Sequence, residues 1–245
     1  GTPARGGARF PEPVPSPRGG EITAALKRAG VAIFGRTTTP ELGLAASTET
    51  TLTGETRNPW DLSRSSGGSS GGAAAAVAAG IVPAAHASDG GGSIRIPAAH
   101  CGLVGLKPTR GRVSFGPDAG EGWGGLAVQH AVTRSVRDSA ALLDATAGPA
   151  PGDPYHAPHA AEPFAAALGR APGRLRVALQ LAPLSGVEVD PACREAALAT
   201  ARLLEEMGHA VEEARPPGDW EVLAPALWVL VAASEVHHLR DLGLG

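Results

Sequence analysis

Residues 67–95 read GGSSGGAAAAVAAGIVPAAHASDGGGSIR, and the order of their elements decides the fold. A glycine- and serine-rich segment at 67–72 precedes residues 73–79, which are alanine except for one valine. Alanine has the highest helix propensity and a glycine ends the run, so we predict a helix at 73–79. Residues 81–87 then read as a strand that runs into three glycines at 90–92. A helix and a strand therefore connect two glycine-rich turns.

The segments on either side alternate between predicted helices and strands. Ser135 followed by Asp138 resembles a capping box, and Asp190-Pro191 is typical of a helix N-terminus. We predict helices at 21–29, from Thr39 to about residue 46, at 135–147 and at 190–207, strands at 31–34, 103–106, 175–181 and 210–213, and loops at 1–20, 57–70 and 149–160. This alternation favours an α/β fold, with a mixed β-sheet between helical layers.

Composition and charge exclude several classes of protein. The chain has 245 residues, of which 43% are hydrophobic and 18% charged, so it is not a disordered chain and can bury a sizeable core. A formal net charge of −3 predicts neither a nucleic-acid nor a membrane-surface partner. Two cysteines, Cys101 and Cys193, cannot form a disulfide framework, which favours a reducing, cytoplasmic location.

The two ends of the chain also carry expectations. No signal-peptide pattern opens the sequence, which begins at Gly1 and stops directly after a helical pattern. The apolar stretch at 222–233 contains Pro225 and is shorter than a membrane span requires. We therefore expect no membrane segment, and we expect the chain to be a piece of a longer polypeptide.

The two glycine-rich segments have a structural and a chemical interpretation. Taken singly, residues 67–72 read as a flexible linker, and residues 88–95 as a tight strand-to-helix turn in which glycine supplies a positive φ. A linker does not fit directly before a helix, however. Taken together they fit an acyl-transfer site, because consecutive glycines before Ser93 let backbone N–H groups converge on an oxyanion. A serine of the other segment can relay the proton to a base.

The order of its motifs shows that the chain resembles the amidase signature family. The resemblance is close over more than 70 residues and weaker over most of the rest of the chain. The matching motifs are Phe34-Gly35-Arg36-Thr37, Thr48-Glu49-Thr50, Thr56-Arg57-Asn58-Pro59-Trp60-Asp61, residues 67–72, residues 89–97 and residues 101–109. The resemblance implies the family's fold, of which residues 1–245 would be the N-terminal and central portion, a single partial domain truncated at both ends.

The resemblance also implies a Ser–cis-Ser–Lys triad. Ser93 falls at the nucleophile position, and Ser69 at the bridging serine, which follows a cis peptide bond after Gly68. Ser70 matches a serine that supports the hydrogen-bond network. The remaining positions match the oxyanion hole (Gly90, Gly91 and Gly92, with the Ser93 N–H) and the charged pair that braces this loop (Asp89 and Arg95).

One member of the triad has no counterpart in the chain. The family's lysine precedes a segment that resembles Gly1-Thr2-Pro3, whereas the only lysines here are Lys27 and Lys107. Lys27 reads as a surface charge on a helix, and Lys107 matches a structural Leu-Lys-Pro-Thr segment. We therefore expect the 245 residues by themselves to be inactive.

The resemblance implies hydrolysis of linear or cyclic small-molecule amides through a serine acyl-enzyme. One alternative is the A subunit of a glutamyl-tRNA amidotransferase, although Gly90 and residues 122–125 resemble stand-alone amidases, including cyclic-amide hydrolases, more closely. Another alternative is a non-catalytic fragment or pseudoenzyme. No cofactor is implied, and His237-His238 lacks the spaced partners of a metal site. A homodimer is a candidate assembly, and Trp123 is interpreted as a packing residue or, alternatively, as part of a substrate channel.

Overall fold

The computed structural model describes residues 6–9 and 19–241, so most of the predicted loop at 1–20 lies outside the described residues. The chain divides into two compact units. The smaller unit is Gly169–Ala232, and the larger unit consists of the segments that precede and follow it in the sequence. The expectation of a single partial domain stays a prediction.

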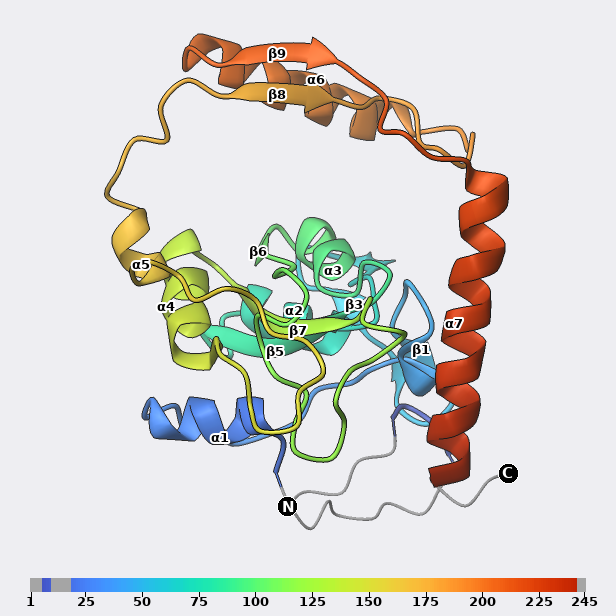
Figure 1. Cartoon of the computed structure of the whole chain (residues 1–245). Helices are drawn as coiled ribbons and strands as arrows, with labels where there is room; N and C mark the ends of the chain where they lie inside the picture. Colours follow the sequence, from blue (N-terminus) through green and yellow to red (C-terminus); the bar gives the residue numbers. More distant parts are fainter. Residues whose placement is uncertain (1–5, 10–18, 242–245) are drawn as a thin grey trace. The chain divides into compact units, whose positions relative to one another are not determined.

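The larger unit contains a three-stranded antiparallel sheet in the order β5 (Ala84–Asp89), β7 (Val128–Thr133) and β6 (Val104–Gly105) (Figure 1). All six residues of β7 are buried, because β7 is the central strand and helices α2 (Gly71–Ala78) and α4 (Val136–Thr146) pack against it. Its register pairs Asp89 at the end of β5 with Val128 at the start of β7. The turn that follows Asp89 therefore leaves the sheet at the point where the chain enters β7.

The core of this unit consists of small aliphatic side chains. Val77 and Ile94 are both fully buried, and the cluster around them also contains Ala73, Ala87, Ala98 and Val132. These residues come from α2, β5, β7, the residue before α3 (Arg95–His100) and α3 itself. Both glycine-rich turns are thus anchored directly to the core.

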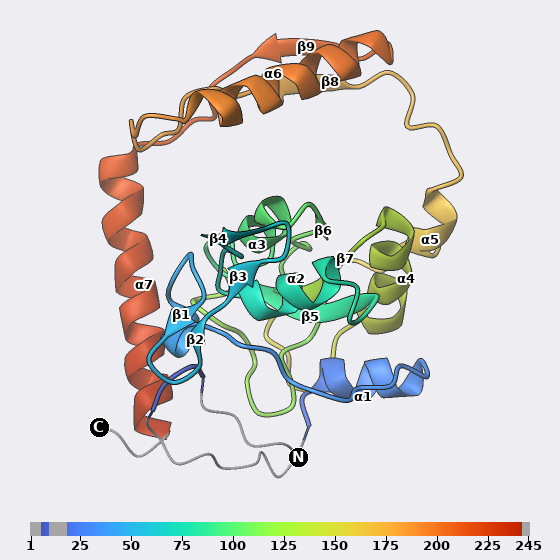
Figure 2. The same cartoon turned by 180° about the vertical axis from the view of Figure 1, so that it is seen from behind.

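Shorter elements surround the sheet (Figure 2). They are α1 (Glu21–Arg28), the 3₁₀ turn η1 (Glu41–Gly43), the antiparallel pairs β1 (Glu49–Thr50) with β2 (Gly54–Glu55) and β3 (Arg57–Asn58) with β4 (Asp61–Ser65), and α5 (Phe164–Ala167). Helix α4 begins as the capping pattern predicts, because Ser135 Oγ accepts a hydrogen bond from the Asp138 N–H at 3.1 Å.

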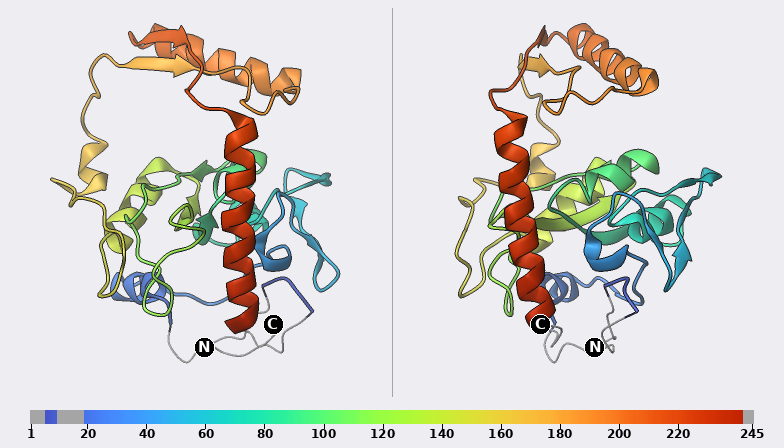
Figure 3. Two further views of the ribbon diagram at one scale, coloured as in Figure 1. Left: turned by 45° about the vertical axis from the view of Figure 1, so that its right-hand side comes forward. Right: turned by 90° about the vertical axis from the view of Figure 1, so that its right-hand side faces the viewer.

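The smaller unit is a β–α–β element made of β8 (Arg176–Leu179), α6 (Pro191–Glu206) and β9 (Ala210–Glu213), labelled in Figure 1 and seen from other sides in Figure 3. The two strands are parallel, with Arg176 opposite Ala210. The side chain of Asp190 caps α6 by accepting a hydrogen bond from the Ala192 N–H at 2.8 Å.

Helix α7 (Trp220–Asp241) begins in the smaller unit, and its residues from Ala233 onward belong to the larger one. The apolar stretch at 222–233, which the sequence predicts to be too short for a membrane span, forms only part of this helix. The helix continues past it, and among the described residues Trp220–Arg240 is long and apolar enough to cross a bilayer. Length and composition alone are criteria that core helices of soluble proteins also meet, so we infer no membrane from them.

Most of the predicted elements are confirmed within a few residues, and three predictions are wrong. Residues 31–34 form no strand, because no described strand pairs with them, and Phe34 is 76% exposed. The helix predicted from Thr39 is a single 3₁₀ turn, because Leu42 has a φ of +52° that an α-helix cannot accommodate. The predicted loop at 57–70 contains the antiparallel pair β3–β4. The α/β class is confirmed, with the antiparallel and parallel strands in separate sheets.

Candidate active site

The fold brings the two glycine-rich segments side by side. The first ends at the N-terminus of α2, and the second connects β5 to α3. The Ser70 N–H donates to the Ser93 carbonyl at 3.3 Å, and the Ser88 N–H donates to Ser70 Oγ at 3.3 Å. Ser70 therefore connects the two segments through hydrogen bonds. Of the two candidate catalytic serines, Ser69 directly precedes Ser70 in the chain, and the Ser93 carbonyl accepts one of these hydrogen bonds.

Ser69 is buried, with 6% of its surface exposed, and the peptide bond between Gly68 and Ser69 is cis, as the sequence resemblance implies. The Ser69 carbonyl accepts a hydrogen bond from Thr39 Oγ1 at 3.2 Å. Gly68 is enclosed by backbone, since a Cβ at this position would lie 2.7 Å from the Ala45 carbonyl oxygen. Only glycine fits there, so the chain before Ser69 is held in one place.

Asp89 and Arg95 brace the second segment. The fully buried carboxylate of Asp89 accepts two hydrogen bonds from the Arg95 side chain, at 2.8 and 2.9 Å. It also accepts three backbone hydrogen bonds, from Gly92, Ile94 and Arg95, at 2.8 to 3.3 Å. Burial alone would raise the pKa of Asp89, but the hydrogen bonds and charge of Arg95, together with the backbone N–H groups, hold that pKa below its ordinary value. The carboxylate is therefore ionised at neutral pH and fixes the turn around it.

This arrangement defines which amides the turn can offer to a substrate oxygen. The Gly92 N–H already donates to Asp89, so among the three predicted oxyanion glycines its amide is occupied. Among the described residues, the N–H groups of Gly90, Gly91 and Ser93 have no hydrogen-bond acceptor. These three amides are the available donors of the turn. Gly92 instead supplies a φ of +131°, in a region that residues with a side chain rarely adopt.

Trp123 is part of this site, and sequence reasoning assigned it primarily to packing. Its six-membered ring lies against Gly90, where a Cβ would be only 2.4 Å from Cε3. The signal that favours the site was present in the sequence as a tryptophan enclosed by glycines at residues 122–125.

The two lysines of the chain lie elsewhere. Lys27 is exposed in the last turn of α1, and Lys107 Nζ donates to the carbonyl of the adjacent Pro108 at 3.0 Å. Neither is hydrogen-bonded to Ser69 or Ser93. The exposure of Lys27 agrees with its interpretation as a surface charge, and Lys107 bonds within the Leu-Lys-Pro-Thr segment to which the sequence assigns it.

Metal-binding clusters and the buried cysteine are two other kinds of group that could supply chemistry. No group of three or more His, Cys, Asp or Glu side chains in the part of the chain that the structure describes is placed to hold a metal ion. Cys101 is fully buried, its Sγ donates to the Ser66 carbonyl at 3.6 Å, and burial raises the pKa of its thiol, so it is not an activated nucleophile.

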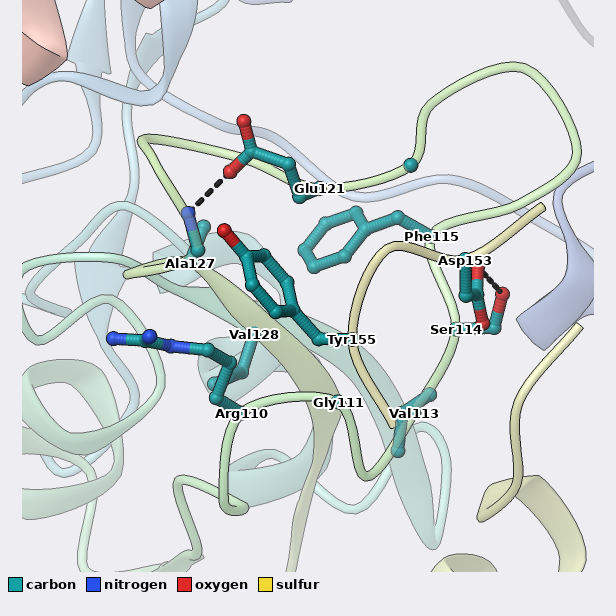
Figure 4. A pocket seen from close by; sticks show the side chains of 12 residues that line it. Arg110, Gly111, Val113, Ser114, Phe115, Glu121, Ala127, Val128, Asp153 and Tyr155 are labelled. Atoms are coloured by element: carbon teal, nitrogen blue, oxygen red, sulfur yellow. Dashed lines mark hydrogen bonds between the residues drawn. The ribbon is translucent and has the colours of Figure 1, made fainter. Parts of the chain in front are cut away.

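A small cavity lies beside the loop that contains Glu121 (Figure 4). Its walls include Tyr155, whose ring centroid is 5.5 Å from the Arg110 guanidinium carbon, and Ser114, which donates a 2.8 Å hydrogen bond to Asp153. The volume open to a water molecule is about 20 Å³, enough for about one water. This cavity cannot hold an amide substrate, and we assign it a structural role.

Comparisons with known proteins place the chain within a family of similar sequences and structures. A family model described as Amidase matches residues 1–243. The chain is 48% identical, over 78% of its length, to a 6-aminohexanoate-cyclic-dimer hydrolase of Paenarthrobacter ureafaciens, of which it covers 39%. A solved structure of 6-aminohexanoate cyclic dimer hydrolase complexed with substrate superposes with a TM-score of 0.87 at 42% identity, over 91% of this chain and 47% of that one.

The A subunit of a glutamyl-tRNA(Gln) amidotransferase from Thermotoga maritima has a similar structure. It superposes with a TM-score of 0.85 at 32% identity, over 98% of this chain and 52% of that one. The chain thus spans between two fifths and about half of the length of these relatives.

Proposed function

Because the chain belongs to the amidase signature family, we propose that the whole protein hydrolyses small carboxylic amides through an acyl intermediate on Ser93. The observation that carries this proposal is the turn between β5 and α3. It places Ser93 in a turn where the amides of Gly90, Gly91 and Ser93 have no acceptor among the described residues, and the buried Asp89 holds the turn in position. Preorganised N–H donors of this kind are the main source of stabilisation for the tetrahedral intermediate of acyl transfer.

We infer the chemistry from the assignment of Ser93 as the nucleophile and Ser69 as the proton relay. Ser93 Oγ attacks the carbonyl carbon of the amide, and its proton passes through Ser69 toward the base. The oxyanion that forms is bound by the amides of Gly90, Gly91 and Ser93. The C–N bond then breaks, the amine leaves with a proton, and water hydrolyses the Ser93 ester to the acid. The family resemblance assigns the base to a lysine, and neither Lys27 nor Lys107 stands at its position.

We propose a cyclic or linear amide with an aliphatic chain as the substrate class. The support is the 48% identity to a 6-aminohexanoate-cyclic-dimer hydrolase and the glycine at position 90, which the Trp123 ring requires. Hydrolysis of glutamine is the second candidate, favoured by the similarity to the amidotransferase subunit. The cytoplasmic location and a homodimeric assembly remain predictions.

The test is hydrolysis by the full-length protein of three substrates: the 6-aminohexanoate cyclic dimer, hexanamide and glutamine. We expect turnover of an aliphatic amide that Ser93→Ala abolishes, whereas Ser63→Ala, which removes an exposed hydroxyl of β4, leaves it unchanged. Turnover of glutamine alone would replace the proposed substrate class with the second candidate. Amide hydrolysis that persists in Ser93→Ala would refute the assignment of the nucleophile.

A further inference from the structure

The indole of Trp123 covers the backbone of the turn that precedes Ser93. A Cβ built on Gly90 would lie 2.4 Å from Cε3 and 2.5 Å from Cζ3 of the ring, and a Cβ on Gly91 would lie 4.0 Å from Cζ3. Carbon atoms that are not bonded to each other do not approach to 2.4 Å, so the ring can rest here only because residue 90 has no side chain. The indole is thus in contact with the residues whose amides we assign to the oxyanion.

The backbone holds Trp123 in this place. Its φ is +54°, in the left-handed region that bulky residues rarely occupy, and residues held there cluster at ligand sites and active sites. The surrounding turn is closed by a 3.0 Å hydrogen bond from the Ala127 N–H to the Gly122 carbonyl and by one from the Gly125 N–H to the Glu121 carboxylate. The side chain is half-buried, so part of the ring surface is accessible.

The polar atom of the indole is occupied as well. Trp123 Nε1 donates to Glu235 Oε1 at 3.2 Å, and an indole has no other donor and no acceptor nitrogen. The surface that remains consists of the π-face and C–H edges. That surface favours apolar groups.

We propose that Trp123 determines substrate specificity by forming an apolar wall beside the acyl group that is attached to Ser93. This inference rests on the proposed amide hydrolysis and adds to it the class of acyl group. An aliphatic acyl chain leaving the carbonyl along this wall buries apolar surface against the indole. A glutamine acyl group carries an ammonium and a carboxylate that need charged partners, whereas the nearby Asp89 and Arg95 are paired with each other.

Gly90 and Trp123 therefore act as one unit. Any side chain at position 90 would displace the indole from the turn, because its Cβ would occupy the position of the ring. Gly90 has no positive φ, so alanine is compatible with its backbone and the steric effect can be tested separately. This gives two independent substitutions, Trp123→Ala and Gly90→Ala, that should change specificity in the same direction.

The experiment compares ethyl and hexyl fluorophosphonates as probes of Ser93 in the full-length protein. Each probe forms an Oγ–P bond while the P–F bond breaks, fluoride leaves, and the serine proton goes to the base. The quantity measured is the ratio of the two second-order labelling rates, which cancels any general loss of reactivity. The variants are Trp123→Ala, Trp123→Phe and Gly90→Ala, with Trp60→Ala as the matched control, since Trp60 is 72% exposed and bonds to the Cys101 carbonyl instead.

We expect the wild-type protein to prefer the hexyl probe and Trp123→Ala to reduce that preference by about tenfold, the range that a change of apolar contact produces in a pocket. Gly90→Ala should reduce it similarly, while Trp123→Phe and Trp60→Ala should retain it. If neither probe labels wild-type Ser93, the proposed function fails. If labelling occurs with the same preference in Trp123→Ala, or in Gly90→Ala should Trp123→Ala not fold, the specificity role is overturned and the proposed function stands.

Discussion

Replacing Asp89 with asparagine should destabilise the protein strongly, although the two side chains have nearly the same shape. The carboxylate accepts five hydrogen bonds, two from the Arg95 side chain and three from backbone N–H groups. Asparagine keeps one acceptor oxygen and turns an N–H₂ group toward donors, so at least two of these bonds are lost together with the charge of the pair.

The magnitude follows from the burial of the two partners. Breaking a fully buried ion pair costs about 3–5 kcal/mol, and because the Arg95 side chain is 52% exposed we take the lower end, about 3 kcal/mol. With an m-value of about 3 kcal/mol/M, the urea midpoint should fall by about 1 M. The assay is urea unfolding of the full-length protein, followed by circular dichroism.

The chain offers a matched control for this substitution. Asp61 also accepts hydrogen bonds from a backbone N–H and from an arginine, Arg64, but both side chains are exposed. Asp61→Asn should leave the urea midpoint unchanged, because exposed ion pairs contribute little. A midpoint for Asp89→Asn that coincides with that of Asp61→Asn would refute the role of Asp89 in holding the Ser93 turn.

Two further predictions concern the proton relay and the response to acid. Ser69→Ala should reduce kcat by about 10³-fold or more with an unchanged Tm, since groups of one catalytic unit fail together; near-normal kcat would return Ser69 to a purely structural role. Burial, with a smaller contribution from the charge of His86, lowers the pKa of His130 to about 4. In the unfolded chain His130 binds a proton below pH 6.5, its ordinary pKa, whereas in the folded protein it stays neutral down to about pH 4. The contribution of neutral His130 to the free energy of unfolding is therefore fully present above pH 6.5, and about 3 kcal/mol of it is lost as the pH drops to 4. His130→Leu should flatten the dependence of the unfolding free energy on pH in that interval, and an unchanged slope would contradict the assignment.

The sequence predicts those parts of the fold that depend on local propensity. Helix α2 follows from its alanines, and α4 and α6 follow from capping residues whose side chains make the expected hydrogen bonds. Strand β7 is not predicted from the sequence, because its buried polar residues Gln129 and His130 interrupt the run of apolar residues that a buried strand normally shows. The partners that make their burial possible are distant in sequence: Gln129 donates to the Ser114 carbonyl at 2.5 Å, and His130 is 3.0 Å from Ser139 Oγ.

The candidate site, like the fold, can be predicted from the sequence only in part. Glycines on both sides of the Ser69-Ser70 pair and before Ser93 mark turns where side chains cannot fit, and that constraint can be read from the sequence. The occupied amide of Gly92 and the contact between Trp123 and Gly90 could not be read, because both depend on atoms that only the folded chain brings together.

The most direct test of the account is the identification of the acylated residue during turnover. The full-length protein would be mixed with a slowly hydrolysed aliphatic amide and the reaction quenched in acid during turnover. The protein would then be digested with trypsin and analysed by mass spectrometry. Ser69 and Ser93 lie on the same tryptic peptide, residues 65–95, so fragment ions are needed to separate them. The account predicts the acyl mass on Ser93 and its loss in Ser93→Ala. An acyl group on Ser69 or on any other residue would contradict it.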